Sequence, residues 1–173
     1  METFGAYIID TDKLAREAVA PGSDALREIA HMWPSVVRMG GLNRPALAEI
    51  IFHDPGARER LNAIVHPHVR RLADAAEAYA KPGQIVVQVV PLLFETGYDG
   101  RCDASVLVIA PEKERIARIT RRDKLRADQI RARISSQIDP EAARPRATYT
   151  IENDGNFAQL KERTRAVYDA LSC

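Results

Sequence analysis

Two carboxylates and a guanidinium lie close together near the start of the chain. Asp10, Asp12 and Arg16 follow the apolar run 6–9, at the point where a strand should pass into a helix. Backbone N–H groups at the start of a helix favour the ionised form of a carboxylate. Such a carboxylate can accept the proton of a substrate hydroxyl or a hydrogen bond from a metal-bound water. The same spacing also fits a simple helix cap, so both interpretations stay open.

The segment 112–146 holds the one concentration of positive charge. Eleven Lys and Arg residues against six Asp and Glu residues give this segment a formal charge of +5. On a helix, Arg115, Arg118 and Arg122 would share one face. Guanidinium groups bind phosphate oxygens and stabilise charge on a phosphoryl group during transfer. A solvated face of ion pairs and an RNA-binding patch are the alternatives, although no aromatic residue that could stack on a base is interleaved in this segment or follows it before Tyr149.

The segment Pro91–Glu95 follows a second apolar run, 85–90. Its apolar middle could line a pocket to which Glu95 adds a polar contact. Alternatively, the strand runs directly into a helix that buries Leu92, Leu93 and Phe94.

The His66-Pro67-His68 triplet raises the question of a metal site. Two histidines at i and i+2 share a face only on a strand, whereas Pro67 is predicted to be the first residue of a helix. The two imidazoles should therefore diverge, and we expect no metal site formed by protein side chains.

Apolar patterning predicts the elements that position these residues. Strands are expected at 6–9, 85–90 and 105–110, with a weaker strand at 149–151, because each run is rich in β-branched residues without alternation. Helical spacing predicts helices near 12–20, 22–32, 44–53, from 67 onward, 112–122, 126–138 and 157–171. Strands that alternate with helices indicate an α/β, doubly wound parallel sheet, in which ligands bind at the carboxyl ends of the strands.

Composition excludes several classes of protein. The 173 residues include 46% apolar and 28% charged side chains, which is typical of an ordinary globular domain. The net charge of +1 gives no overall attraction to nucleic acid or to a membrane, so neither partner is expected. The sequence also lacks a signal peptide and a membrane span, and we expect a cytoplasmic protein. Cys102 and Cys173 form no CxxC motif and are expected to be free thiols.

Taken together, these segments resemble the dephospho-coenzyme A kinase family. The match runs in order through nearly the whole chain, in the segments 9–17, 41–44, 51–55, 66–70, 91–95, 121–123, 131–137 and 151–155. The resemblance implies ATP-dependent phosphorylation of the ribose 3′-hydroxyl of dephospho-coenzyme A, the last step of coenzyme A biosynthesis. It also implies a P-loop kinase fold over 1–173, with a helical substrate-binding insertion at 21–82 and a lid at 112–146.

The resemblance assigns roles to individual residues. Asp12 is similar to the base that deprotonates the acceptor hydroxyl, with Arg118 as its catalytic partner at the phosphates. ATP would be bound by Arg118, Arg122, Arg133, Gln137 and Asn153. The acceptor would be bound by Asp10, Arg16, His66, Arg70, Leu92 and Glu95. The cofactors implied are ATP and Mg²⁺.

The glycine-rich phosphate loop of that family is missing from this sequence. None of the nine glycines is followed by lysine, so no P-loop motif occurs in any register. The expected fold therefore lacks the first strand and the P-loop, and the open sheet position could support an oligomer. Three interpretations follow: an N-terminally shortened version of an active kinase, a kinase completed by a second chain, or a non-catalytic binder of coenzyme A-type ligands. Without the P-loop we expect the chain as written to be inactive rather than active. An Arg-rich RNA-binding module is the alternative from a different class.

Overall fold

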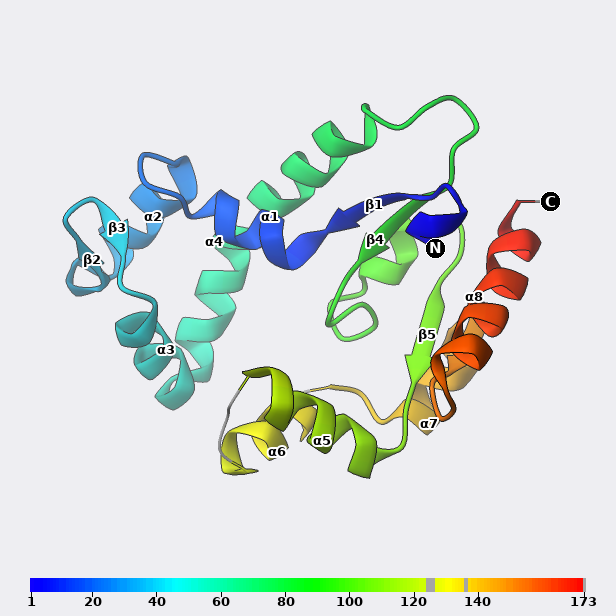
Figure 1. Ribbon diagram of the computed structural model, residues 1–173. Helices are drawn as coiled ribbons and strands as arrows, with labels where there is room; N and C mark the ends of the chain where they lie inside the picture. Colours follow the sequence, from blue (N-terminus) through cyan, green and yellow to red (C-terminus); the bar gives the residue numbers. More distant parts are fainter. Residues whose placement is uncertain (124–126, 136, 173) are drawn as a thin grey trace. The chain divides into compact units, whose positions relative to one another are not determined.

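Four short segments rich in β-branched residues form two parallel strand pairs in this α/β structure, a computed structural model that describes residues 1–123, 127–135 and 137–172 (Figure 1). Strand β1 (Tyr7–Asp10) pairs with β4 (Val86–Val89), with Tyr7 opposite Val86. Strand β5 (Val106–Ile109) pairs with β6 (Tyr149–Glu152), with Val106 opposite Tyr149. The predicted strands and their parallel direction are confirmed.

The described residues divide into two units, each of which contains one of these strand pairs. The N-terminal unit spans Ala6–Pro91, and the C-terminal unit consists of Met1–Gly5 together with the chain from Leu92 onward. No helix in the described ranges is long and apolar enough to cross a membrane.

Polar caps start three of the four helices of the N-terminal unit. Its helices are α1 (Thr11–Ala18), α2 (Asp24–Met32), α3 (Arg44–His53) and α4 (Pro55–Glu77). The side chains of Asp10, Ser23 and Asn43 accept hydrogen bonds from backbone N–H groups in the first turns of α1, α2 and α3. Such caps satisfy donors that have no partner within the helix, and they set where each helix begins.

The apolar core of the N-terminal unit lies where its helices meet. Helices α2 and α3 both pack against α4, and Figure 1 shows α3 beside the first half of α4, away from the β1–β4 pair. Six buried residues from this region form one cluster: Val19, Ala25, Ile29, Val36, Leu47 and Ile64. Because Ala25, Ile29 and Val36 are fully buried, this cluster holds the helices together through burial of apolar surface.

Two features of this unit differ from the sequence-based expectation. Helix α4 begins at Pro55 and contains Pro67 in its interior, so the prediction that Pro67 starts a helix is wrong. A proline ring inside a helix removes one backbone hydrogen bond, and the rest of this long helix sustains the loss. The hairpin formed by β2 (Val37–Arg38) and β3 (Gly41–Leu42) was not predicted, because two-residue strands leave no periodic signal.

The C-terminal unit packs its longest helix against β6. It contains α5 (Glu112–Asp123), α6 (Ala127–Ser135), α7 (Pro140–Ala143) and α8 (Phe157–Leu171). The helix predicted to open at Pro111-Glu112 is confirmed, whereas the short α7 was not predicted. Cys102 is a free thiol, as expected, and Cys173 lies outside the described residues.

Polar and cation–π contacts are prominent in the packing of this unit. Neither α5 nor α8 buries a side chain fully. Phe94 is buried under Arg146, whose guanidinium carbon lies 4.9 Å from the ring centre. Residues 91–97 form turns rather than a helix, so the predicted alternative of a strand running directly into a helix is wrong.

Two strand residues are exposed to solvent, although parallel strands covered by helices on both faces would be buried. Val89 of β4 is 50% exposed and Val108 of β5 is 57% exposed. The expectation that helices cover both faces therefore fails at these two positions.

Candidate functional site

Asp10 and Asp12 take different positions at the carboxyl end of β1. The Asp10 carboxylate accepts hydrogen bonds from the backbone N–H groups of Asp12 and Lys13, at 3.0 and 3.3 Å. Thr11 donates its hydroxyl to the Val89 carbonyl at 2.8 Å, which ties the start of α1 to the end of β4. Asp10 therefore acts as the cap, and the exposed Asp12 carboxylate lies in the first turn without a hydrogen-bond partner among the described residues.

Three other residues predicted for the acceptor pocket lie on the packed helices α1 and α4. Arg16 lies four residues after Asp12 on α1, and His66 and Arg70 lie four residues apart on α4. The Arg70 side chain donates to the His66 backbone carbonyl at 3.4 Å, and no hydrogen bond or ion pair in the described structure joins the three side chains to one another. Burial, followed by the positive charge of Arg70, lowers the pKa of His66 below its ordinary value of 6.5. His66 is therefore neutral at pH 7.

The imidazoles of His66 and His68 diverge, as expected for positions two apart on a helix. His68 Nε2 lies 3.1 Å from a Glu28 carboxylate oxygen, and Arg71 donates to His68 Nδ1 at 2.9 Å. Arginine can only donate, so Nδ1 is the accepting nitrogen and Nε2 carries the proton. His68 thus joins α2 to α4, and the described residues contain no group of three or more acidic, His or Cys side chains placed to hold a metal.

Leu92 and Glu95, the remaining acceptor candidates, belong to the C-terminal unit. Leu92 is partly exposed in the turn that follows Pro91. The Glu95 carboxylate accepts a hydrogen bond from the Ile138 backbone N–H at 2.6 Å. Glu95 therefore already holds the chain between α6 and α7.

The arginines of α5 are engaged with neighbouring acceptors. Arg115 donates to the Gln137 side chain at 2.6 Å, which places Gln137 beside α5. Arg118 pairs with Glu114 and donates to the Asn153 carbonyl at 3.3 Å. Arg122 donates to the neighbouring Asp123 from two nitrogens, at 2.6 and 2.8 Å. The side chain of Arg133 lies outside the described residues.

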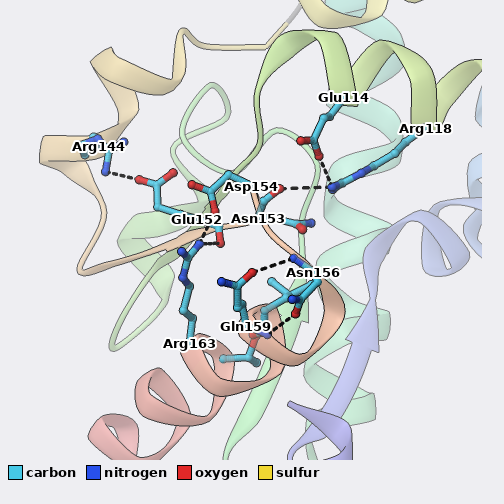
Figure 2. A network of polar contacts seen from close by, with 11 residues as sticks. Glu114, Arg118, Arg144, Glu152, Asn153, Asp154, Asn156, Gln159 and Arg163 are labelled. Carbon is cyan, nitrogen blue, oxygen red and sulfur yellow. Dashed lines mark hydrogen bonds and ion pairs between the residues drawn. The ribbon is translucent and has the colours of Figure 1, made fainter.

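Asn153 lies at the carboxyl end of β6, in a loop of four residues (153–156), here called the Asn153 loop. Its backbone N–H donates to the Ile109 carbonyl at 2.6 Å and so extends the pairing of β6 with β5. Asn156 caps α8, and the Gln159 side chain returns a hydrogen bond to the Asn156 backbone N–H (Figure 2). The loop thus brings the backbone carbonyl of Asn153 within hydrogen-bond distance of Arg118.

Sequence analysis missed three charged residues around this loop. Arg163 contacts the Glu152 carbonyl and the Asp154 carboxylate, and Arg144 pairs with the Glu152 carboxylate at 2.8 Å (Figure 2). Glu114 was also missed, although its spacing of four from Arg118 on a helix is a recognisable signal. The contacts of Arg163 and Arg144 span 8 to 11 residues across a loop and leave no periodic pattern.

The two units therefore carry complementary chemical groups. The N-terminal unit presents a carboxylate that can accept a proton, together with Arg16 and Arg70. The C-terminal unit presents guanidinium groups and an asparagine at the carboxyl ends of its strands, where α/β proteins bind nucleotides. Phosphoryl transfer uses groups of both kinds, a carboxylate that accepts a proton and guanidiniums that bind phosphate.

Comparison with known proteins places the chain in a family. The family model described as dephospho-CoA kinase matches residues 1–159. A dephospho-CoA kinase from Moorella thermoacetica is 45% identical, with 99% of this chain and 83% of that protein covered. One from Thermobifida fusca is 39% identical, with 96% and 84% covered.

A solved structure supports the fold. The crystal structure of TT1252 from Thermus thermophilus superposes with a TM-score of 0.85 at 36% identity, and it covers 98% of this chain and 87% of that chain.

Proposed function

Because the chain belongs to the dephospho-CoA kinase family, we propose that it transfers the γ-phosphoryl group of ATP to the ribose 3′-hydroxyl of dephospho-CoA. The bond between the γ-phosphorus and the bridging oxygen of ADP breaks, and a bond to the 3′-oxygen forms. The proton of the hydroxyl passes to a carboxylate, and ADP leaves.

Asp12 is the residue that we assign as the proton acceptor. Asp10 takes over the capping of α1, which leaves the Asp12 carboxylate exposed and without a hydrogen-bond donor of its own. A carboxylate that no other group occupies is available to a substrate hydroxyl. This division of work between two neighbouring aspartates is the observation that carries the proposal.

The acceptor is assigned to residues of both units. We infer that Asp10, Arg16, His66 and Arg70 bind dephospho-CoA in the N-terminal unit, and that Leu92 and Glu95 contribute from the C-terminal unit. A neutral His66 would offer one N–H donor and one acceptor nitrogen, which suits a hydroxyl or amide group better than a phosphate.

ATP is assigned to the C-terminal unit. Asn153 would contact the adenine, while Arg118 and Arg122 would bind the phosphates, with Arg133 and Gln137 beside them. Arg118 and Arg122 are paired with Glu114 and Asp123 in this structure. A guanidinium has five N–H donors, so these arginines can bind phosphate through their remaining N–H groups or by giving up a carboxylate.

Magnesium would accompany ATP rather than occupy a cage of protein side chains. Mg²⁺ keeps several waters and is usually held by substrate phosphates and one or two carboxylates. The single exposed carboxylate of Asp12 fits this mode, and the described residues contain no larger cluster of metal ligands. When bound, Mg²⁺ neutralises the charge on the phosphate oxygens.

The finer architecture is part of the same proposal. We infer a doubly wound kinase domain over 1–173, in which 21–82 forms the substrate-binding insertion and 112–146 forms the lid. Residues 124–126 and 136 of that lid lie outside the described ranges. The cytoplasmic location stays a prediction from the sequence.

A test of the proposal is an assay for coenzyme A. The purified chain is incubated with Mg-ATP and dephospho-CoA, and mass spectrometry detects 3′-phosphorylation. The matched sample is the same chain extended upstream by a family-type phosphate loop, since no glycine here is followed by lysine. Product in either sample supports a kinase, whereas binding of dephospho-CoA without product in both supports a non-catalytic binder.

A further inference from the structure

The Asn153 loop is held by guanidinium groups from two helices. Arg163 of α8 donates from one nitrogen both to the Glu152 carbonyl and to an Asp154 carboxylate oxygen, the latter at 2.5 Å. Arg118 of α5 donates to the carbonyl of Asn153 itself. Figure 2 shows Arg163 and Arg118 approaching this part of the chain from different elements.

Arg163 holds the residue before Asn153 and the residue after it. Because both neighbours are fixed to one rigid guanidinium, the backbone at Asn153 has little freedom to rotate. Its N–H is also fixed by the Ile109 carbonyl at 2.6 Å. These contacts together determine the direction in which the Asn153 side chain leaves the backbone.

The Asn153 carboxamide is itself not used by this network. In the described part of the chain it makes no hydrogen bond, while the Glu152 and Asp154 carboxylates both accept from arginine. Arg163 also lowers the pKa of Asp154, which keeps this carboxylate ionised at neutral pH. The network therefore supports the loop and leaves the amide available for a ligand.

We propose that Arg163 is a positioning residue for ATP, which it serves by bridging Glu152 and Asp154 so that the Asn153 carboxamide faces the base. This inference rests on the proposed binding of adenine by Asn153. Arg163 itself touches no reacting atom, and its effect is confined to binding of the nucleoside part of ATP.

The test compares ligands with and without a base. Displacement of a fluorescent ATP analogue gives the dissociation constants of ATP and of inorganic tripolyphosphate for each variant. Arg163→Met should raise the dissociation constant of ATP about three- to tenfold, which is the size of a typical net hydrogen-bond contribution, and should leave that of tripolyphosphate unchanged. Arg163→Lys should recover part of the ATP affinity, because lysine keeps the charge opposite Asp154 but loses the planar geometry.

Arg165 on the same helix provides a matched control. It pairs with Asp169 four residues away and its guanidinium lies over the Phe4 ring, so it makes an ion pair and a ring contact without touching the loop. Arg165→Met should leave the affinity for ATP unchanged. If Arg163→Met matches Arg165→Met, or weakens ATP and tripolyphosphate equally, the positioning role is wrong.

Asn153→Ala separates this inference from the function on which it rests. If Asn153→Ala weakens ATP and the double variant with Arg163→Met is no weaker than Asn153→Ala alone, Arg163 acts through Asn153. If Asn153→Ala leaves ATP affinity unchanged, the adenine contact itself is wrong. Should Arg163→Met fail to fold, Asp154→Asn removes the other half of the ion pair and gives the same comparison.

Discussion

The two units hold their candidate residues in opposite ways. In the N-terminal unit, apolar burial around Ile29 holds the helices, and the side chain of Asp12 has no partner in the described structure. In the C-terminal unit, α5 and α8 bury no side chain fully, and the candidates Arg118 and Glu95 already have polar partners. We infer from this difference that a change at Asp12 alters catalysis without altering stability, whereas a change at Arg118 or Glu95 also removes an existing contact.

The largest expected effect concerns Asp12. Asp12→Asn removes the proton acceptor and should lower kcat about 10²- to 10⁴-fold. The free energy of unfolding should stay the same, because Asp10 provides the cap. Steady-state kinetics and denaturant unfolding measure the two quantities. Glu17→Gln, which removes another exposed carboxylate of α1, is the control and should leave kcat unchanged.

The next effect concerns the core of the N-terminal unit. Ile29 is fully buried, so Ile29→Ala should lower the free energy of unfolding by about 2–5 kcal/mol. Phe157→Ala on α8 is the counterpart in the other unit and should cost about 0.5 kcal/mol or less, because Phe157 is 80% exposed. Similar losses in urea unfolding would show that the contrast between the units is false.

Arg118 tests whether the position of a guanidinium on α5 matters, and not only the charge of this helix. Arg118→Ala removes a phosphate ligand and the hydrogen bond to the Asn153 carbonyl, and should lower kcat/KM about 10²-fold. Arg121, an exposed residue of the same helix, is the matched control, and Arg121→Ala should retain the activity of the parent chain. Equal losses in both variants would indicate that the total charge of α5 matters and not the position of Arg118.

The smallest effect concerns the pH dependence of stability. Burial lowers the pKa of His66 in the folded chain. As the pH falls below about 6.5, the imidazole is therefore protonated in the unfolded chain before it is protonated in the folded chain. The contribution of His66 to stability is therefore complete above pH 6.5 and is lost as the pH falls towards its folded pKa. His66→Asn should flatten the fall in the free energy of unfolding between pH 7.5 and 5.5. An unchanged slope would contradict the burial of His66.

Apolar patterning predicted the four longer strands and most helices, because their burial leaves a periodic or continuous apolar signal. It failed at Pro67, since the local rule that proline starts a helix gave way to the packing of a 23-residue helix. It also failed at the hairpin 37–42. Met39 takes a left-handed conformation there, with φ of 51°, and methionine is not a residue type that predicts this conformation.

The candidate site was predictable where residues lie close in sequence. Asp10 and Asp12 were recognised together, but only the structure shows which of them caps α1. The role of Arg163 could not be predicted from the sequence, because its partners lie nine and eleven residues away across a turn. The pairing of Glu95 with Ile138 spans 43 residues and depends on tertiary folding alone.

The most direct test of the division between the units is a crossed calorimetric titration. Parent chain, Arg70→Ala and Asn153→Ala are each titrated with dephospho-CoA and with a non-hydrolysable ATP analogue in the presence of Mg²⁺. We predict that Arg70→Ala weakens only dephospho-CoA and Asn153→Ala weakens only the ATP analogue. Loss of both ligands in either variant, or the opposite pairing, would contradict the assignment of Arg70 to dephospho-CoA and of Asn153 to ATP.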